Sequence, residues 1–499
     1  MSKRTVDAFA WRLLSESSKL VLQIGVQITL AHLLPVDAFG VLAVASLIVN
    51  FGSRVSEIGT GPALIQRAQI TARHIRAAFG LSIACGAAVS MGIWLAAPLT
   101  ATLFRVDSAA PILRLIGLVF VIGSIGTTAE SLLLRRMDYR RLLWVDLLSY
   151  GCGYAIVGIG LALLHYGVWA LAWATVSQTV FKTTLLLVMS RHPMRPCLAG
   201  AETRQLLNFG IGMTLGRLAS FAAQNADYFV VARWLGTTAL GFYSRAYQLM
   251  CLPIYQFSSI LNSVLFPAYS SIQTDAERLR RGYLASVCLS TIVVFPALTT
   301  MAIVAPELMT AVFGAQWAPS ALALQILCLS GMLYCVYNLA DSLVRAAGAV
   351  YWKFLYHTIY AASVLGGAFV GRHWGIAGVA AAVTAATAIG YVLMSHLSLR
   401  LTKASWPTFF AAHLPGIALA CAAAAIGLPV AAVARSAEVA PLVGLAAISG
   451  ACTIAAAAAL LAVPDAWLAP TVSDVIGRAR KAAFEMAAAA RRRYRLGTV

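Results

Sequence analysis

The sequence is poor in charged residues. Asp, Glu, Lys and Arg make up 11% of its 499 residues, whereas 60% are hydrophobic. That balance excludes a soluble globular domain. Short alternating segments of the kind that build a lipid-facing β-barrel are also missing. The class that remains is a helical membrane protein.

Motifs of enzymes and metal sites are missing as well. No Walker loop, HExxH motif or paired-carboxylate glycosidase pattern stands out. The loops are too short to hold an extramembrane catalytic domain. The nine cysteines contain no CxxC pair and mostly lie in apolar stretches, which is typical of small buried apolar residues. We therefore expect a transporter rather than an enzyme, with no metal and no cofactor apart from a coupling ion.

Long apolar stretches follow one another almost to the C-terminus, and each is long enough to cross a bilayer. The fold predicted from them is an all-α polytopic membrane protein with about 14 transmembrane helices. The predicted spans are residues 9–33, 40–65, 78–99, 111–134, 142–164, 166–189, 206–231, 238–267, 283–305, 320–345, 351–371, 375–399, 409–433 and 439–463.

The net charge of +19 is concentrated in alternate loops. With the N-terminus in the cytoplasm, the cytoplasmic loops hold most of the Arg and Lys residues and the opposite loops hold few. This positive-inside bias predicts an even number of spans and two cytoplasmic termini. Because the charge follows topology, a nucleic-acid partner is not expected. The first span follows the N-terminus without a small-residue cleavage site, so no removable signal peptide is predicted.

The chain also contains an internal duplication. Residues 38–40 (AFG) recur as residues 239–241 (ALG), and residues 129–132 (AESL) recur as residues 340–343 (ADSL). An offset near ~205 residues is typical of transporters built from two parallel halves. We expect two similar lobes that insert in the same orientation and enclose a cavity.

The predicted organisation has four parts: a six-helix lobe at residues 1–190, a second at 206–400, two further helices at 409–463 and a basic cytoplasmic tail at 464–499. The two further helices are interpreted as a lipid-facing appendage. From residue 472 the tail has the pattern of an amphipathic helix that binds anionic membrane lipids. A solvated basic end is the alternative.

Ionisable side chains inside the spans are candidate functional residues, because an unpaired charge in lipid is costly. The candidates for an anionic headgroup site are Arg12, Glu16, Lys19, Arg54, Arg217 and Arg245. Arginine suits bidentate contact with phosphate. The candidates for coupling or gating are Glu57, Asp227, Glu130 and Asp341. Asp146 and Lys182 are further ionisable residues within spans.

Two pairs of these residues are matched by the duplication, and each has two interpretations. Glu16 matches Arg217: the two residues either close a salt bridge between lobes or belong to the path of an anionic cargo. Glu130 matches Asp341 near the cytoplasmic ends of their spans, close to Arg135 and Arg345. An interfacial ion pair is one reading there, and binding of a coupling Na⁺ or H⁺ is the other.

Three segments carry a family likeness. They are residues 34–40 (LPVDAFG) running to 61–67 (GPALIQR), residues 240–247 (LGFYSRAY) continuing to 265–268 (LFPA), and residues 313–317 (FGAQW) followed by 324–327 (LQIL). In their order and spacing they resemble the polysaccharide flippases of the MOP superfamily of multidrug, oligosaccharidyl-lipid and polysaccharide exporters.

The resemblance implies a flippase of the bacterial inner membrane. Its cargo would be an undecaprenyl-diphosphate-linked oligosaccharide, moved to the periplasmic leaflet by alternating access and often with ion-gradient coupling. A polysaccharide polymerase and glycosyltransferases of the same pathway would be partners. The alternatives are a small-molecule exporter of multidrug type, which would favour acidic cavity residues, and a membrane-embedded polymerase, which would need a large periplasmic loop.

Overall fold

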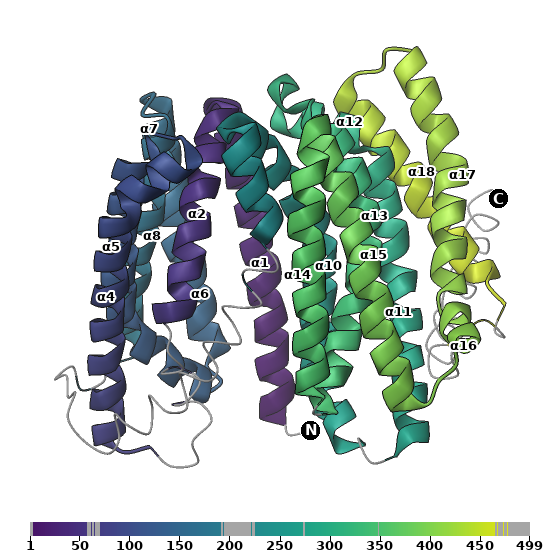
Figure 1. The fold of residues 1–499 in the computed structure, drawn as a ribbon, viewed down its shortest axis with the longest axis horizontal. Helices are drawn as coiled ribbons and strands as arrows, with labels where there is room; N and C mark the ends of the chain where they lie inside the picture. Colours follow the sequence, from purple (N-terminus) through teal and green to yellow (C-terminus); the bar gives the residue numbers. More distant parts are fainter. Residues whose placement is uncertain are drawn as a thin grey trace, which may run out of the picture. The chain divides into compact units, whose positions relative to one another are not determined.

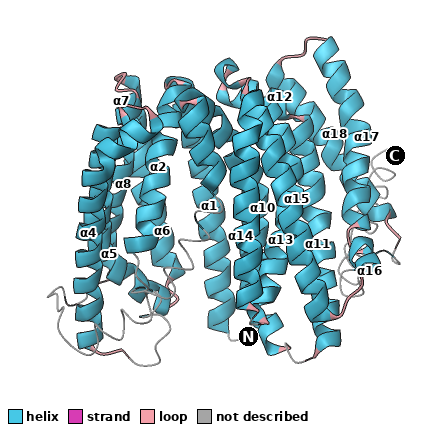
Figure 2. Ribbon diagram, viewed as in Figure 1, coloured by secondary structure: helices cyan, strands magenta, loops and turns pink. Residues whose placement is uncertain are grey.

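Regular structure in the described residues of the computed structural model is helical throughout (Figure 2). The structure describes residues 3–56, 61, 64, 70–190, 193, 221, 225–272, 275–347, 349–464, 467, 473 and 477. Within that part of the chain, ten stretches are long and apolar enough to cross a membrane. The predicted all-α polytopic membrane fold is therefore confirmed. Each predicted span overlaps described helical residues, although only residues 221 and 225–231 of the span 206–231 are described.

The chain divides into two compact units, Met1–Ser244 and Arg245–Val499, each of which is described by itself. The boundary falls inside the long helix α10. The two predicted lobes, the pair of extra helices and the basic tail are defined by sequence repeats and composition instead, and they stay predictions.

The first unit is a bundle of long helices (Figure 1). Its elements are α1 (Lys3–Leu33), α2 (Val36–Ser56), α4 (Ala72–Phe104), α5 (Ala109–Arg135), α6 (Tyr139–Tyr150), a π-helical segment (Gly151–Gly158), α7 (Ile159–Leu163), α8 (Val168–Met189), a second π-helical segment (Val231–Leu235) and the start of α10 (Thr237–Ser271). Helix α5 packs between α4 and α8, and α1 packs along α6.

Capping residues set the starts of two of these helices. Thr71 and His74 form a capping box before α4, and Asp138 accepts a hydrogen bond from the backbone N–H of Arg141 before α6.

The two copies of the repeated motif meet within this unit. A Cβ atom on Gly241 would lie 2.5 Å from the carbonyl oxygen of Val36, and one on Gly40 would collide with the carbonyl group of Thr237. Gly40 and Gly241 are matched in the duplication, as are Val36 and Thr237. The start of α2 and the start of α10 therefore cross with their backbones in close contact. The contact is symmetric, because each glycine meets the residue that lies four positions before the other glycine. Glycine is required at both positions because no side chain fits.

The second unit is built around α11. Its elements are the rest of α10, α11 (Ala276–Ile303), α12 (Ala305–Glu307), a π-helical segment (Leu308–Phe313), a 3₁₀ turn (Ala315–Trp317), α13 (Ser320–Ala346), α14 (Val350–Gly371), a 3₁₀ turn (Arg372–Trp374), α15 (Gly375–Thr402), α16 (Trp406–Ala411), α17 (Leu414–Ser436) and α18 (Pro441–Ala462). Helix α11 contacts α13 on one side and α17 on another, and α15 lies between α13 and α14.

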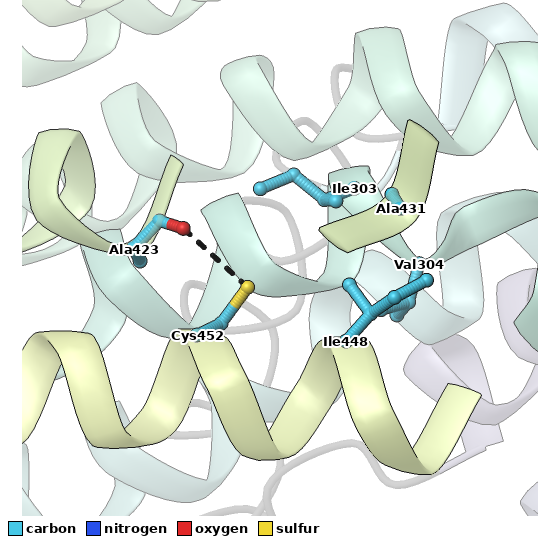
Figure 3. Packing of buried hydrophobic residues seen from close by; sticks show 6 residues of the cluster. All are labelled: Ile303, Val304, Ala423, Ala431, Ile448 and Cys452. Atoms are coloured by element: carbon cyan, nitrogen blue, oxygen red, sulfur yellow. Dashed lines mark hydrogen bonds between the residues drawn. The ribbon is translucent and has the colours of Figure 1, made fainter. Parts of the chain in front are cut away.

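Helices α17 and α18 are the two helices predicted to lie outside the repeat. In their most apolar segments 22% and 17% of the residues are buried, against 61% in α13, so they lie at the periphery of the second unit. A small apolar cluster attaches them to the end of α11 (Figure 3). It contains Ile303, Val304, Ala423, Ala431, Ile448 and Cys452.

An ion pair reinforces that attachment. The guanidinium of Arg435 on α17 donates to both carboxylate oxygens of Glu307, at 2.7 and 3.0 Å, and to the backbone oxygen of Ile303 at 2.8 Å. Bidentate geometry of this kind makes a strong charge-assisted contact. Arg435 thus fixes the end of α17 to α12.

Candidate functional site

The first unit contains a network of four charged side chains from four helices. Lys182 on α8 lies 2.8 Å from an oxygen of Glu130 on α5 and 3.8 Å from an oxygen of Asp146 on α6. Lys19 on α1 lies 3.5 Å from the other oxygen of Asp146. Two lysines and two carboxylates face one another, so the network is formally neutral. Pairing of this kind is how a membrane protein holds ionisable groups at the depth of its apolar spans.

The network includes two of the predicted site residues, Lys19 and Glu130, and Asp146 and Lys182 complete it. Arg135, which lies near Glu130 in the sequence, donates to the backbone oxygen of Leu64 at 2.7 Å. An interfacial ion pair was one of the two interpretations of Glu130, and its partner in the structure is Lys182 on α8, far away in the sequence. The signal for it was the presence of a lysine late in a predicted span.

The second unit contains a cluster around Asp341. One carboxylate oxygen of Asp341 lies 2.9 Å from the Nζ atom of Lys353 and 3.2 Å from the Nε2 atom of His357. The other lies 3.1 Å from the Nε atom of Arg345. The hydroxyl group of Tyr337 lies 3.1 Å from the same imidazole nitrogen of His357. The end of α13 and the start of α14 are joined by these contacts.

Of the two interpretations of Asp341, the interfacial ion pair with Arg345 is present in the structure, and binding of a coupling ion stays a prediction. Sequence reasoning had not singled out Lys353 or His357 as site residues. Their four-residue spacing near the start of α14 places both on one helical face, and this spacing was the available signal.

Asp227 and Arg245 are both buried. In the first unit, Tyr243 donates to a carboxylate oxygen of Asp227 at 2.7 Å. In the second, the guanidinium of Arg245 lies 5.3 Å from the ring centroids of both Phe313 and Trp317, a distance typical of cation–π contact.

Arg245 lies in one of the segments that carry the family likeness (240–247), and its two stacking partners lie in another (313–317). The guanidinium of Arg245 also donates to the side-chain oxygen of Gln248 at 3.2 Å. Its surroundings are those of a packing residue, and its place in a headgroup site stays a prediction.

The remaining candidates divide into exposed and undescribed residues. Arg54 is exposed in the last turn of α2. The side chains of Arg12 and Glu16 are not described. Glu57 and Arg217 lie entirely outside the described residues. The predicted pairing of Glu16 with Arg217 therefore stays a prediction. Among the described side chains, no group of three or more His, Cys, Asp or Glu residues is placed to hold a metal ion.

Helices long enough to span a membrane, with paired charges inside the spans, define a polytopic membrane protein. Solved structures share this fold. A lipid II flippase MurJ in an inward closed conformation superposes with a TM-score of 0.68 at 14% identity, covering 89% of this chain and 97% of that one. An inward-facing multidrug resistance MATE family transporter of the MOP superfamily superposes with a TM-score of 0.62 at 17% identity, covering 78% and 96%.

The chain belongs to the polysaccharide biosynthesis protein family, whose model matches residues 29–322. It is 26% identical to the lipopolysaccharide biosynthesis protein WzxC of Escherichia coli over 380 residues, 74% of this chain and 77% of that protein. It is 27% identical to the succinoglycan biosynthesis transport protein ExoT of Rhizobium meliloti over 329 residues, 66% of each. The likeness to MOP-superfamily polysaccharide flippases is thereby confirmed. The protein is a multi-pass bacterial membrane transporter and not an enzyme.

Proposed function

We propose that this transporter flips an undecaprenyl-diphosphate-linked oligosaccharide repeat unit from the cytoplasmic to the periplasmic leaflet of the bacterial inner membrane. The product would feed lipopolysaccharide or exopolysaccharide synthesis. The observation that carries the proposal is the family membership, together with relatives named for lipopolysaccharide and succinoglycan biosynthesis. The fold supports it, because a structural neighbour is named as a lipid II flippase.

The chemistry of the spans fits such a cargo. A diphosphate headgroup needs cations within the membrane, and the described spans supply Lys19, Lys182, Arg345 and Lys353. A prenyl tail can stay in the bilayer while the headgroup crosses. The carboxylates that pair with these lysines and arginines are candidates for binding a coupling Na⁺ or H⁺. We expect alternating access, two cytoplasmic termini and no other cofactor.

The test is complementation of surface polysaccharide in cells that lack the gene. Wild-type protein should restore the polymer, whereas Arg54→Ala and Arg217→Ala should abolish it at unchanged protein level. Arg73→Ala is a matched control, because Arg73 is an exposed arginine in the first turns of α4. Failure of the wild-type protein to restore any polymer would reject the flippase function. Normal polymer in both test variants would reject only the assigned headgroup site.

The second candidate function is export of small molecules, which the likeness to multidrug transporters favours. Cationic drugs need uncompensated carboxylates in the cavity. In the two described charge clusters, lysine and arginine equal or exceed the carboxylates. Unchanged drug resistance in cells that express the protein is therefore expected. A raised resistance to several cationic drugs would favour this second function.

A further inference from the structure

Asp227 is a buried carboxyl group that makes no ion pair with any residue the structure describes. Its exposed fraction is 1%. The hydroxyl group of Tyr243 donates to its Oδ2 atom at 2.7 Å, whereas its Oδ1 atom has no hydrogen-bond partner among the described residues. Glu130, Asp146 and Asp341 differ, because each of them lies beside a lysine or an arginine. The charge of Asp227 must therefore be neutralised in another way.

Aromatic rings pack around the helical segment that carries Asp227. Tyr228 meets the ring of Tyr243 edge to face at 5.7 Å, and Phe229 meets the ring of Phe104 at 5.4 Å. In such surroundings an ionised carboxylate that accepts one hydrogen bond from an uncharged hydroxyl group is costly. A protonated carboxyl group avoids that cost because it carries no charge.

The charged side chains on the neighbouring elements are exposed or occupied elsewhere. The guanidinium of Arg233, in the π-helical continuation of the same segment, stacks on the adjacent tryptophan ring at 5.6 Å. Arg105 and Asp107, which follow α4, are exposed. Asp37 at the start of α2 is also exposed, and its carboxylate accepts the backbone N–H of the next residue at 2.9 Å. Within the described part of the chain, none of these groups forms an ion pair with Asp227.

The matched position in the other copy of the duplication is apolar. At the offset that relates the two glycines of the α2–α10 crossing, Asp227 corresponds to Val26 and Tyr243 corresponds to Leu42. Val26 is itself buried, at 5% exposure. The same position of the repeat is thus filled by a valine in one copy and by a carboxyl group in the other. Packing of the helix does not require the carboxyl group, so its presence indicates a function.

A proton suits this site better than a metal ion does. A metal ion would need several oxygen ligands around it. Among the described side chains, the hydroxyl group of Tyr243 is the one that reaches the carboxylate of Asp227. A proton needs only the carboxylate itself.

The position of Asp227 in its span also bears on how a proton would reach it. The predicted topology places it about one helical turn from the periplasmic end of the span 206–231. At 1% exposure the carboxyl group does not meet water in the conformation that the structure shows. Exchange of a proton therefore requires a second conformation in which the site is open.

Resting on the proposed function, we propose that Asp227 is the site that binds a coupling proton. The carboxyl group is protonated in the buried state, and Tyr243 donates to its carbonyl oxygen. When the site opens, the carboxyl group releases H⁺ to water and becomes an ionised carboxylate. That charge returns to the apolar site only after a proton has bound again, so a difference in pH across the membrane biases the conformational change.

Infrared spectroscopy of the full-length protein in nanodiscs tests the protonation state. At neutral pH, the difference spectrum between the wild-type protein and Asp227→Asn should contain the C=O stretching band of a protonated carboxyl group. Asp107→Asn, which replaces an exposed carboxylate, should retain the band. If Asp227→Asn does not fold, Asp227→Val replaces it, because valine stands at the matched position. The absence of the band from the wild-type protein or from the difference spectrum would overturn the proposal.

Flipping in vesicles that contain undecaprenyl-diphosphate-linked oligosaccharide tests the coupling. An imposed pH gradient should change the flipping rate of the wild-type protein and of Asp107→Asn, and Asp227→Asn should lose this response. An undiminished response in Asp227→Asn, or a wild-type response to a sodium gradient but not to a pH gradient, would overturn the proposal. These results would also be expected of a carboxyl group that is protonated for structural reasons alone.

A variant that does not flip at all is covered by a measurement on the wild-type protein. Addition of the lipid-linked oligosaccharide at constant pH should change the intensity of the carboxyl band, because cargo and proton binding are linked through the conformational change. An unchanged band would overturn the coupling role. Wild-type protein that flips no lipid under any gradient would reject the proposed function instead, and the infrared spectrum would then decide alone whether Asp227 binds a proton.

Discussion

Lys182 lies 2.8 Å from Glu130 and 3.8 Å from Asp146, which come from two other helices, whereas the ion pair of Lys19 is with Asp146 at 3.5 Å. Replacing Lys182 by Met leaves Glu130 and Asp146 facing each other without their shared cation. The expected cost is about 1–3 kcal/mol of unfolding free energy, toward the lower end because the side chains are partly exposed. Lys19→Met should cost less. Thermal unfolding of the detergent-solubilised protein measures both.

The double variant Lys182→Met/Glu130→Gln is the control for that comparison. Removing one carboxylate together with the lysine relieves the repulsion, so the double variant should be more stable than Lys182→Met alone. A double variant that is less stable than the single one would contradict the assigned network.

Glu307 gives a prediction about pH, because it lies in α12 outside the apolar spanning segments. Burial by itself raises the pKa of Glu307, but the hydrogen bonds and charge of Arg435 outweigh burial and hold the pKa below the ordinary value of 4.5. A carboxyl group with a lowered pKa stabilises the fold above its ordinary pKa. That contribution is lost as the pH falls through the lowered value.

The corresponding measurement is the unfolding temperature as a function of pH. The wild-type protein should lose stability as the pH falls below about 4.5, and Glu307→Gln should lose less over the same range. Arg278→Gln is a control, because Arg278 is exposed and pairs with Asp275 at the start of α11. Parallel curves for the wild-type protein and Glu307→Gln would show that Glu307 adds nothing to the pH dependence.

Single residues also show where sequence reasoning stops. The pairing of Asp341 with Arg345 was predictable, since residues four apart on a helix are neighbours. The pairing of Glu130 with Lys182 was not, because it depends on how α5 packs against α8. Arg245 was predicted to bind cargo from its depth in a span. Its position beside Phe313 and Trp317 arises from a fold that brings distant segments together.

At the scale of helices, hydrophobicity predicted nearly all of the described elements. Boundaries were less accurate: the second span was expected to begin at residue 40, but α2 begins at Val36. The π-helical segment at Gly151–Gly158 was not expected either. Its residues (GCGYAIVG) are uncharged and mostly apolar, as in many of the spans. It lies against α8 through Gly153, where a Cβ atom would come within 2.6 Å of the Gln178 backbone. Composition reports burial in the membrane and not the local winding of a helix.

The crossing of α2 and α10 supplies a prediction at this scale. Gly40→Ala should destabilise the protein by about 1–3 kcal/mol, because the added methyl group meets the backbone of Thr237. Gly25→Ala in α1 is the matched control, since a Cβ atom there would have no neighbour within 4 Å. It should be neutral or slightly stabilising, as alanine is the better helix former.

Thermal unfolding separates the two alanine variants. Equal unfolding temperatures for Gly40→Ala and Gly25→Ala would contradict the close approach of the two repeated motifs. Gly241→Ala should behave like Gly40→Ala, because its added methyl group would meet the carbonyl oxygen of Val36.

For the whole molecule, the distribution of charge in the loops predicts topology. Alkaline phosphatase fused after Glu438, in the connection between α17 and α18, should be active, because that loop is expected in the periplasm. The same enzyme fused after Lys403, at the end of α15, should be inactive. A fluorescent protein at the C-terminus should fold and fluoresce in the cytoplasm. The opposite pattern of activities would invert the predicted orientation.

The fold class, the family and the duplication could all be predicted from the sequence, because they depend on apolar length, residue order and repetition. How the charged side chains pair depends on the packing of the helices. The sequence named Lys19, Glu130, Asp146, Lys182 and Asp341 as ionisable residues within the spans. The structure shows which of them pair and adds Lys353 and His357 as partners of Asp341.

The central claim is that this protein moves a lipid-linked oligosaccharide across the membrane. The most direct measurement is a flipping assay with purified protein in vesicles that contain undecaprenyl-diphosphate-linked oligosaccharide, read out by a sugar-modifying enzyme added outside. We predict that the protein speeds exposure of the inner-leaflet lipid, and that an imposed proton or sodium gradient changes the rate. Exposure at the rate of protein-free vesicles, under every gradient and with correctly folded protein, would contradict the claim.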